Sequence, residues 1–424
     1  MNDLARRVQR TYLVLTLGNT LAASFIWGIN TLFLLDAGFS NLEAFAANAF
    51  FTAGMVLFEV PTGVVADTRG RRASYLLGTV TLAISTLLYW LLWVEQGAFW
   101  MWAVVSVLLG LGFTFFSGAV EAWLVDALNH AGYGGTLETV LGRGQMVGGA
   151  AMLGGSVLGG VVAQATDLGV PFLLRVGVLL VMFLVAGLLM RDLGFEPDRG
   201  EGPMQAVRTV LGASIEHGLR NPPVRGVMLG APFTAGVGIY AFYALQPYLL
   251  EAYGDPDAYA VAGLAAALIA GAQVAGGFLA PRVRAVFHSR TTVLIGTVVV
   301  SSVLALLAVF DGFVVALIVC ALWGLVSAAQ MPVRQAYLND MIPSKQRATV
   351  LSFDSLMGSS GGVVIQPGLG RAADLHGYGA SLAIGGALQL LAVPFLVASR
   401  RNGHAADVAR SAAGTPAPAA PSAS

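Results

Sequence analysis

The stretch GVVADTRGRR at residues 63–72 concentrates one carboxylate and three guanidinium groups in ten residues. Only 11% of the whole chain is charged, and long apolar segments flank the stretch on both sides. An aspartate near a helix end can cap the N-terminus of a neighbouring helix, and paired arginines can bind carboxylates through parallel hydrogen bonds. The residues therefore offer ion pairs between helices. The alternative is that the three arginines only hold this loop on one side of a membrane.

A second group of ionisable residues lies inside the apolar segments. A charge at the centre of a bilayer costs about 2.5–3.5 kcal/mol on insertion scales, so such residues are candidates for function. At about 1.5 Å of rise per helical residue, four of them share one layer and form a candidate proton or charge network. These four are Glu59, Glu121, Arg334 and Asp354.

Within this network we expect Glu121 to pair with Arg334. A neighbouring guanidinium stabilises the charged form of a carboxylate, so moving the two apart would favour proton uptake at Glu121. The alternatives are a static network of salt bridges and direct contact with a solute. A fifth residue, Arg175, lies nearer the opposite face, and we expect its head group to extend outward to water.

The elements that must hold these residues are membrane-spanning helices. The chain is 56% hydrophobic with a mean hydropathy of +0.75, and about 20 apolar residues are enough to cross a bilayer as a helix. The predicted fold class is therefore all-α and integral to a membrane. We predict twelve spans, at residues 11–35, 42–66, 73–94, 99–128, 141–165, 170–190, 225–251, 258–280, 291–310, 313–340, 347–371 and 379–399.

Proline and polar residues divide the chain into two halves. Residues 191–224 contain Pro197, Pro203, Pro222 and Pro223 and read as a linker. The predicted organisation is a first six-helix bundle at residues 1–190, this linker, a second bundle at residues 225–401, and a disordered tail at residues 402–424 that is rich in Ala, Pro and Ser.

The basic residues orient the predicted spans. Of the 23 Lys and Arg residues, all but Arg175, Arg334 and Arg371 fall on the side of the two termini. Short connections on the other side carry acids such as Asp36, Glu95 and Asp167. Because basic loops stay in the cytoplasm, both termini are predicted to be cytoplasmic. The expected location is the cell membrane.

The two halves repeat each other weakly at an offset of 214–215 residues. Six spans per repeat leave both halves in the same orientation, related by an axis along the membrane normal. Many transporters are built from such repeats, with the solute path between the halves. The matches are Leu32–Ala37 with Pro247–Ala252, Gly63–Ala66 with Gly277–Ala280, and Glu121–Asp126 with Gln335–Asp340.

At GVVADTRGRR the chain resembles the major facilitator superfamily. The family's loop between spans 2 and 3 reads G-x-x-x-D-R/x-x-G-R-R/K, and Gly63, Asp67, Gly70, Arg71 and Arg72 occupy its fixed positions. The runs at residues 59–63 and 117–123 also resemble variants of the family. The resemblance covers about residues 8–400 and implies a fold of two six-helix bundles.

The resemblance also implies a role for the loop. It would lock the two halves together at the cytoplasmic end, with Asp67 facing the start of span 11 near Arg347 and Arg71 pairing with Asp126. In the second half the loop is degenerate, because Pro281 stands where the aspartate would be.

Span 5 resembles a glycine pattern of antiporters in this family. The matching positions are Gly142, Ala151, Gly155, Ser156, Gly159 and Gly160, with Ala151 and Ser156 in place of the pattern's Gly and Pro. Small residues allow close helix approach, so the pattern favours an exporter, and tight packing alone is the alternative. The family's span-4 arginine is absent, because Ser106 stands four residues before Gly110 and Leu109 replaces a glutamine.

The resemblance points to spans 1, 4, 7 and 10 as the walls of a solute cavity. An aromatic wall with few charges suits an amphipathic or apolar solute, although ordinary helix packing would also explain each residue. The candidates are Asn19, Trp27, Asn30, Tyr240, Phe242, Tyr243 and Gln246.

Together these features predict a secondary transporter, specifically a proton-coupled exporter of small hydrophobic or amphipathic molecules. The alternatives are a metabolite uptake symporter and a receptor or scaffold that keeps the fold without moving solute. The sequence shows no catalytic, metal-ligand or phosphate-loop spacing, and Cys320 is its single cysteine. We therefore expect no enzyme activity, cofactor, metal or nucleic-acid partner, and a monomer that binds solute, protons and lipid.

Overall fold

The computed structural model describes residues 3–402 except 117, 198–201, 288, 307–309, 311 and 343–346. Helices make up nearly all of this part of the chain. They are α1 (Asp3–Trp27), α2 (Asn30–Asp36), α3 (Asn41–Arg69), α4 (Arg71–Val94), α5 (Phe99–Thr114), α6 (Ala119–His130), α7 (Leu137–Ala165), α8 (Val170–Leu189), α9 (Pro203–Ser214), the π-helical turn η1 (Ile215–Leu219), α10 (Pro222–Tyr253), α11 (Tyr259–Phe287), α12 (Arg290–Leu306), α13 (Phe313–Met341), α14 (Arg347–Gln389) and α15 (Ala392–Asn402).

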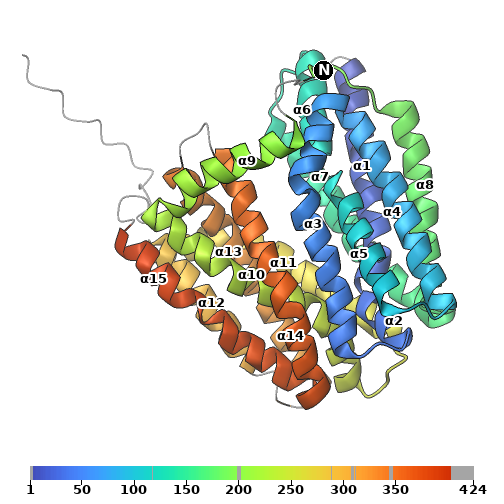
Figure 1. Cartoon of the computed structure of the whole chain (residues 1–424), viewed down its shortest axis with the longest axis vertical. Helices are drawn as coiled ribbons and strands as arrows, with labels where there is room; N and C mark the ends of the chain where they lie inside the picture. Colours follow the sequence, from blue (N-terminus) through green and yellow to red (C-terminus); the bar gives the residue numbers. More distant parts are fainter. Residues whose placement is uncertain are drawn as a thin grey trace, which may run out of the picture.

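The helices pack as two bundles (Figure 1). Helices α1–α8 form the first bundle and α10–α15 the second, and the bundles meet where α3 packs on α14 and α7 packs on α11. Helix α9, inside the predicted linker, touches α3 of the first bundle and α14 of the second. The predicted tail beyond residue 402 lies outside the described residues.

Nine of the described helices are long and apolar enough to cross a membrane, or ten if the bent pair α1 and α2 counts as one span. Two features explain the difference from twelve. The described part of α12 has 17 residues, fewer than the roughly 20 that span a bilayer. The helical stretch Val350–Asn402 counts as one span of 53 residues, yet α14 is interrupted at Gly377, where φ is 80°. The twelve-span count therefore stays a prediction.

Two predicted spans are broken in the structure. Span 11–35 divides into α1 and α2, which meet at a 44° bend. Span 99–128 divides into α5 and α6 just before Ala119. Gly118 precedes α6 with a φ of 68°, which is a left-handed conformation that glycine adopts without steric cost. At the first break the Trp27 carbonyl accepts a hydrogen bond from the second bundle, and at the second break the Phe115 carbonyl accepts one from Ser74 of α4.

The two ends of the molecule differ in charge. We call the end that carries Asp3, the α3–α4 junction at Gly70 and the end of α15 the basic end. The opposite end, which carries the α2–α3, α4–α5, α7–α8 and α10–α11 connections, is the acidic end. Figure 1 places the chain start and α9 at the basic end and α2 at the acidic end.

Candidate functional site

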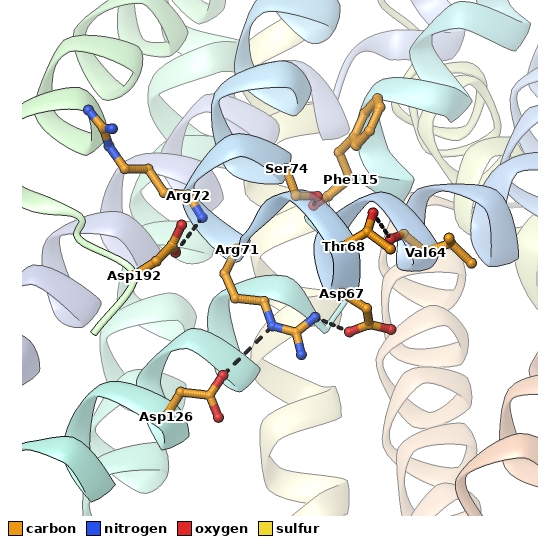
Figure 2. Close-up of polar contacts among 9 residues, drawn as sticks. All are labelled: Val64, Asp67, Thr68, Arg71, Arg72, Ser74, Phe115, Asp126 and Asp192. Carbon is orange, nitrogen blue, oxygen red and sulfur yellow. Dashed lines mark hydrogen bonds and ion pairs between the residues drawn. The ribbon is translucent and has the colours of Figure 1, made fainter. Parts of the chain in front are cut away.

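The charged loop forms a small network of ion pairs at the basic end (Figure 2). Gly70 turns the chain with a φ of 101°, so that α3 ends and α4 begins within one residue. Arg71, the first residue of α4, pairs with Asp67 in the last turn of α3. Its Nε lies 3.9 Å from Asp126 Oδ2 on α6. The loop thus ties together α3, α4 and α6 of the first bundle.

Arg72 binds the end of α8. Its Nη2 donates a hydrogen bond of 2.6 Å to the Gly187 carbonyl, and its backbone N–H donates one of 2.9 Å to Asp192 Oδ1. These contacts remain in the first bundle and the segment that follows it. The expected contact of Asp67 with the side chain of Arg347 lies outside what the structure describes, because only the backbone of Arg347 at the start of α14 is placed.

The second bundle repeats the arginine–aspartate pair. Arg290, the first residue of α12, pairs with Asp340 near the end of α13 at 2.6 Å. Arg71 and Asp126 hold the matching places at the start of α4 and near the end of α6. Sequence reasoning missed Arg290 because the loop pattern around it is degenerate. The alignment of Asp126 with Asp340 was the signal that could have found it.

The four residues of the predicted charge network are arranged differently in the structure. Arg334 pairs with Asp354 through both terminal nitrogens, with 2.6 Å between Nη2 and Oδ1. The expected pair of Arg334 with Glu121 is therefore corrected, since the bidentate partner lies on α14. Glu121 lies exposed in the first turn of α6, and Glu59 lines a cavity between the bundles.

The bundles are joined by hydrogen bonds at the break between α1 and α2. In an unbroken helix the Thr31 N–H would donate to the Trp27 carbonyl. Here Thr31 N–H donates to Gln246 Oε1 at 3.0 Å, and Gln246 Nε2 donates to the Trp27 carbonyl at 2.6 Å. A side-chain amide carries both a donor and an acceptor, so Gln246 of the second bundle replaces one helix bond of the first.

A proline opens the facing helix at the same level. Pro247 has no N–H, so the carbonyl four residues earlier, that of Tyr243, has no partner inside α10. Thr31 Oγ1 donates to this carbonyl at 3.0 Å. The contact between the bundles is therefore made by backbone groups that irregular helices on both sides set free. We call the residues Trp27, Thr31, Tyr243 and Gln246 the seam.

The seam lies on the axis that relates the two repeats. Thr31 and Gln246 are 215 residues apart, which is the offset found in the sequence. Trp27 and Phe242 have the same separation, and their rings meet edge to face at 6.5 Å. A residue that touches its own counterpart must lie close to the axis between the halves.

A second contact joins the bundles at the acidic end. Asp374 Oδ1 accepts a hydrogen bond of 2.8 Å from the Asn41 N–H, and its Oδ2 accepts one of 3.0 Å from the Leu42 N–H. A carboxylate here stabilises the positive N-terminal end of α3. Tyr378 also donates to the side chain of Asn41. Sequence reasoning did not single out Asp374, because the cap crosses between bundles.

The small residues of α7 lie against both bundles. A Cβ at Gly159 would clash with the Phe25 carbonyl of α1. A Cβ at Gly160 would lie 2.5 Å from the Tyr259 carbonyl and 3.0 Å from the Gly263 Cα of α11. The Ser156 carbonyl faces Gly263 in the same crossing. Ala151 is buried and Gly155 packs on α1, whereas Gly142 has open space beside it.

The remaining residues expected to contact solute are engaged in packing. Tyr75 donates to Asn19 Oδ1 at 2.7 Å, and Asn30 Nδ2 donates to Asn48 Oδ1 at 2.9 Å. Tyr240 is buried and shares a hydrogen bond of 2.5 Å with Ser381. Their assignment to a solute site stays a prediction.

A cavity of about 430 Å³ lies between the bundles. Among the described residues that line it are one carboxylate, that of Glu59, and hydroxyl groups on one face of α14 from Ser352, Ser355 and Ser359. Its other walls are mostly apolar or aromatic and come from α3, α5 and α14. These lining residues are Met55, Val56, Phe113, Thr114, Phe116 and Leu356.

The fold and the seam define an all-helical, multi-pass membrane protein whose two bundles meet around a cavity. The chain belongs to the Major Facilitator Superfamily, whose family model matches residues 12–365. The predicted fold class is thereby confirmed, and the protein has a transporter fold rather than that of an enzyme.

Solved structures share this fold at low sequence identity. A point mutant of the nucleoside transporter NupG matches with a TM-score of 0.78 at 12% identity over 94% of this chain and 100% of its own. The D-xylose–proton symporter matches with a TM-score of 0.63 at 16% identity over 92% of this chain and 96% of its own. A bacterial homologue of the human lysosomal transporter Spinster, solved in an inward-facing and unoccupied conformation, also matches. Its TM-score is 0.66 at 14% identity over 96% of this chain and 98% of its own. No curated protein matches the chain in sequence.

Proposed function

We propose that the protein is a secondary transporter that exports a small amphipathic molecule in exchange for protons. The observation that carries the proposal is the seam. The bundles are bonded to each other at the acidic end by hydrogen bonds to side chains, while GVVADTRGRR at the basic end is bonded within its own bundle. Such an arrangement suits a molecule that opens at one end while it is closed at the other.

The basic end faces the cytoplasm in this proposal, in line with the distribution of Lys and Arg. The structure then corresponds to the inward-facing state of the cell-membrane protein. In the outward-facing state we propose that Asp67, Gly70, Arg71 and Arg72 lock against the start of α14. The Arg71–Asp126 pair would keep α4 and α6 moving as one body.

The cavity supports an amphipathic solute. Its apolar and aromatic walls would surround the body of such a molecule on its path between the bundles, and the serines of α14 offer hydroxyl groups to its polar atoms. For the coupling proton we propose Glu121 or Glu59. Asp354 is less available, because Arg334 binds both of its carboxylate oxygens.

The test uses purified protein in liposomes with an acidic lumen and a trapped pH dye. A panel of lipophilic cations, amphipathic acids, neutral drugs and small metabolites is added to wild type and to Glu121→Gln. A compound that dissipates the gradient in wild type only would support proton exchange at Glu121. Dissipation that survives in Glu121→Gln but not in Glu59→Gln would place the proton at Glu59. Solute that leaves loaded liposomes together with the protons would favour the symporter, and silence for every compound would favour the receptor.

A further inference from the structure

One arginine of the first bundle is buried away from water. Arg175 on α8 is 4% exposed, which corrects the expectation that its head group extends outward to water. Its Nε is sealed from solvent and has no hydrogen-bond partner in the described part of the chain. Among the described residues no carboxylate forms an ion pair with it, unlike the buried Arg290, which pairs with Asp340.

Arg175 lies beside the break in the first span. It shares one face of α8 with Phe172 and Leu179, and this buried face packs on α1 and α4. Phe172, about one turn away, stacks on Phe33 of α2 at a centroid distance of 3.9 Å. The face of α8 that carries Arg175 is thus mainly apolar and aromatic.

The neighbour of Arg175 from the other bundle is Tyr243, whose phenol is close enough to interact with it electrostatically. Tyr243 also belongs to the seam, since its carbonyl accepts from Thr31. It also interacts electrostatically with Tyr89 of α4, which is hydrogen-bonded to Ser106 of α5. A positive charge of the first bundle therefore interacts with a phenol of the second.

A buried cation without a counter-ion is costly, and the cost falls when an anion binds to it. A guanidinium binds a carboxylate through two parallel hydrogen bonds, and a phenol can donate a third. We propose that Arg175 and Tyr243 form the binding site for a carboxylate group on an otherwise apolar, aromatic solute. This assignment rests on the proposed function and names the class of solute, an amphipathic organic acid.

An acid bound there would contact both bundles. Arg175 belongs to the first bundle and Tyr243 to the second, so the ligand would favour the state in which the seam is formed. The same ligand would lose the phenol when the bundles part at the acidic end. The site thus couples occupancy to the position of the bundles.

The test compares two fluorescent probes, 1-pyrenebutyrate and the uncharged 1-pyrenebutanol, on purified protein in detergent. Binding is followed by energy transfer from tryptophan. We expect wild type to bind the acid at least about tenfold more tightly than the alcohol, and Arg175→Met to bind the two alike. Tyr243→Phe should reduce the preference by a smaller factor. Arg371→Met, which removes an exposed arginine of α14, is the matched control and should keep the full preference.

A second measurement separates a ligand site from a structural arginine. Replacing an unpaired buried charge by an apolar side chain of similar length should raise the Tm of the ligand-free protein, by about 2 °C or more. An Arg175→Met protein that keeps the preference for the acid, or a wild type without any preference, would overturn the proposal. Because binding in detergent requires no transport, a protein that binds the acid but moves nothing would contradict only the proposed function.

Discussion

At the scale of single residues, the contact between the bundles depends on the chemistry of one amide. Gln246 gives an acceptor to the Thr31 N–H and a donor to the Trp27 carbonyl. No carboxylate or apolar side chain offers both groups. When the bundles separate, the two backbone groups of the first span can bond to each other instead. Gln246 thus competes with a helix bond, which makes the contact reversible.

We therefore predict that Gln246→Leu shifts the protein away from the state closed at the acidic end. The substitution leaves two buried backbone groups without a partner, each at a cost of about 1–3 kcal/mol in that state. The shift is measured by spin–spin distances between labels at Leu42→Cys and Leu375→Cys, which lie exposed on the acidic side of the two bundles. The native Cys320 is buried.

Gln389→Leu is the control for this variant, because Gln389 is a buried glutamine of α14 in the second bundle. It should leave the label distances unchanged. An equal distance distribution in wild type and Gln246→Leu would show that the amide does not hold the seam.

A second prediction concerns the ion pair of α13 and α14. The side chain of Asp354 is 5% exposed and is bound on both oxygens by Arg334. Removal of one member of a buried pair leaves an uncompensated charge, which typically costs about 3–5 kcal/mol. We expect Asp354→Leu to lower the thermal stability strongly, as measured by scanning fluorimetry in detergent.

The double variant Arg334→Met with Asp354→Leu removes both charges and should recover most of this loss. If the single variant is as stable as wild type, the pair does not stabilise this state. If the double variant stays as unstable as the single one, packing rather than charge explains the loss.

At the scale of elements, the sequence predicts helices well and their interruptions poorly. Apolar runs located α3, α4, α7 and α8 closely, because length and hydropathy alone decide whether a segment crosses a bilayer. The break between α1 and α2 depends on Gln246, which lies in the other bundle. A local pattern cannot reveal a helix bond that a distant side chain replaces.

The same limit applies to the charged residues. Arg71 and Asp126 were expected to be neighbours through the family resemblance, and the structure brings them together. The sequence places carboxylates from several helices in the same layer as Arg334. Which of them pairs with it depends on the rotation of α13 and α14 about their axes, which periodicity does not fix. Asp374 was missed because it caps the start of α3 across the contact between bundles.

A third prediction belongs to the crossing of α7 and α11. Gly160→Val would place side-chain atoms where the Tyr259 carbonyl and Gly263 already lie. These are backbone atoms, which cannot move aside by changing a rotamer, so the two helices must separate. We expect a longer distance between the labels at Leu42→Cys and Leu375→Cys, and a lower Tm.

Gly149→Ala provides the control on the same helix, since no described atom outside its own stretch of helix lies within 4 Å of the position of its Cβ. It should leave the distance between the labels unchanged. It should not lower the Tm, because alanine favours the helix. A Gly160→Val protein with the wild-type distance would mean that α7 and α11 tolerate more space than the structure suggests.

At the scale of the whole molecule, contacts within the bundles and contacts between them have different roles. The Arg71–Asp126 and Arg290–Asp340 pairs each lie within one bundle and tie its helices together. The seam and the Asp374 cap lie between bundles. Ion pairs inside the bundles and exchangeable hydrogen bonds between them suit rigid-body movement of the bundles.

A final prediction follows from this division. If the bundles move as rigid bodies, a link across the acidic end must stop transport, whereas a link inside one bundle at the same end must not. We propose Asn41→Cys with Tyr378→Cys for the first link, since these side chains are hydrogen-bonded between α3 and α14. A short bis-maleimide would join them, and flux would be measured in the liposome assay with any solute that wild type carries.

The matched pair is Asp36→Cys with Trp93→Cys, whose native side chains are hydrogen-bonded at 2.8 Å within the first bundle. We expect at least about tenfold loss of flux for the linked Asn41–Tyr378 pair and little loss for the linked Asp36–Trp93 pair. Binding of solute from the basic end should survive in both, because the cavity beside Glu59 is not altered. Full flux through the protein linked between its bundles would exclude transport by alternate opening of the two ends.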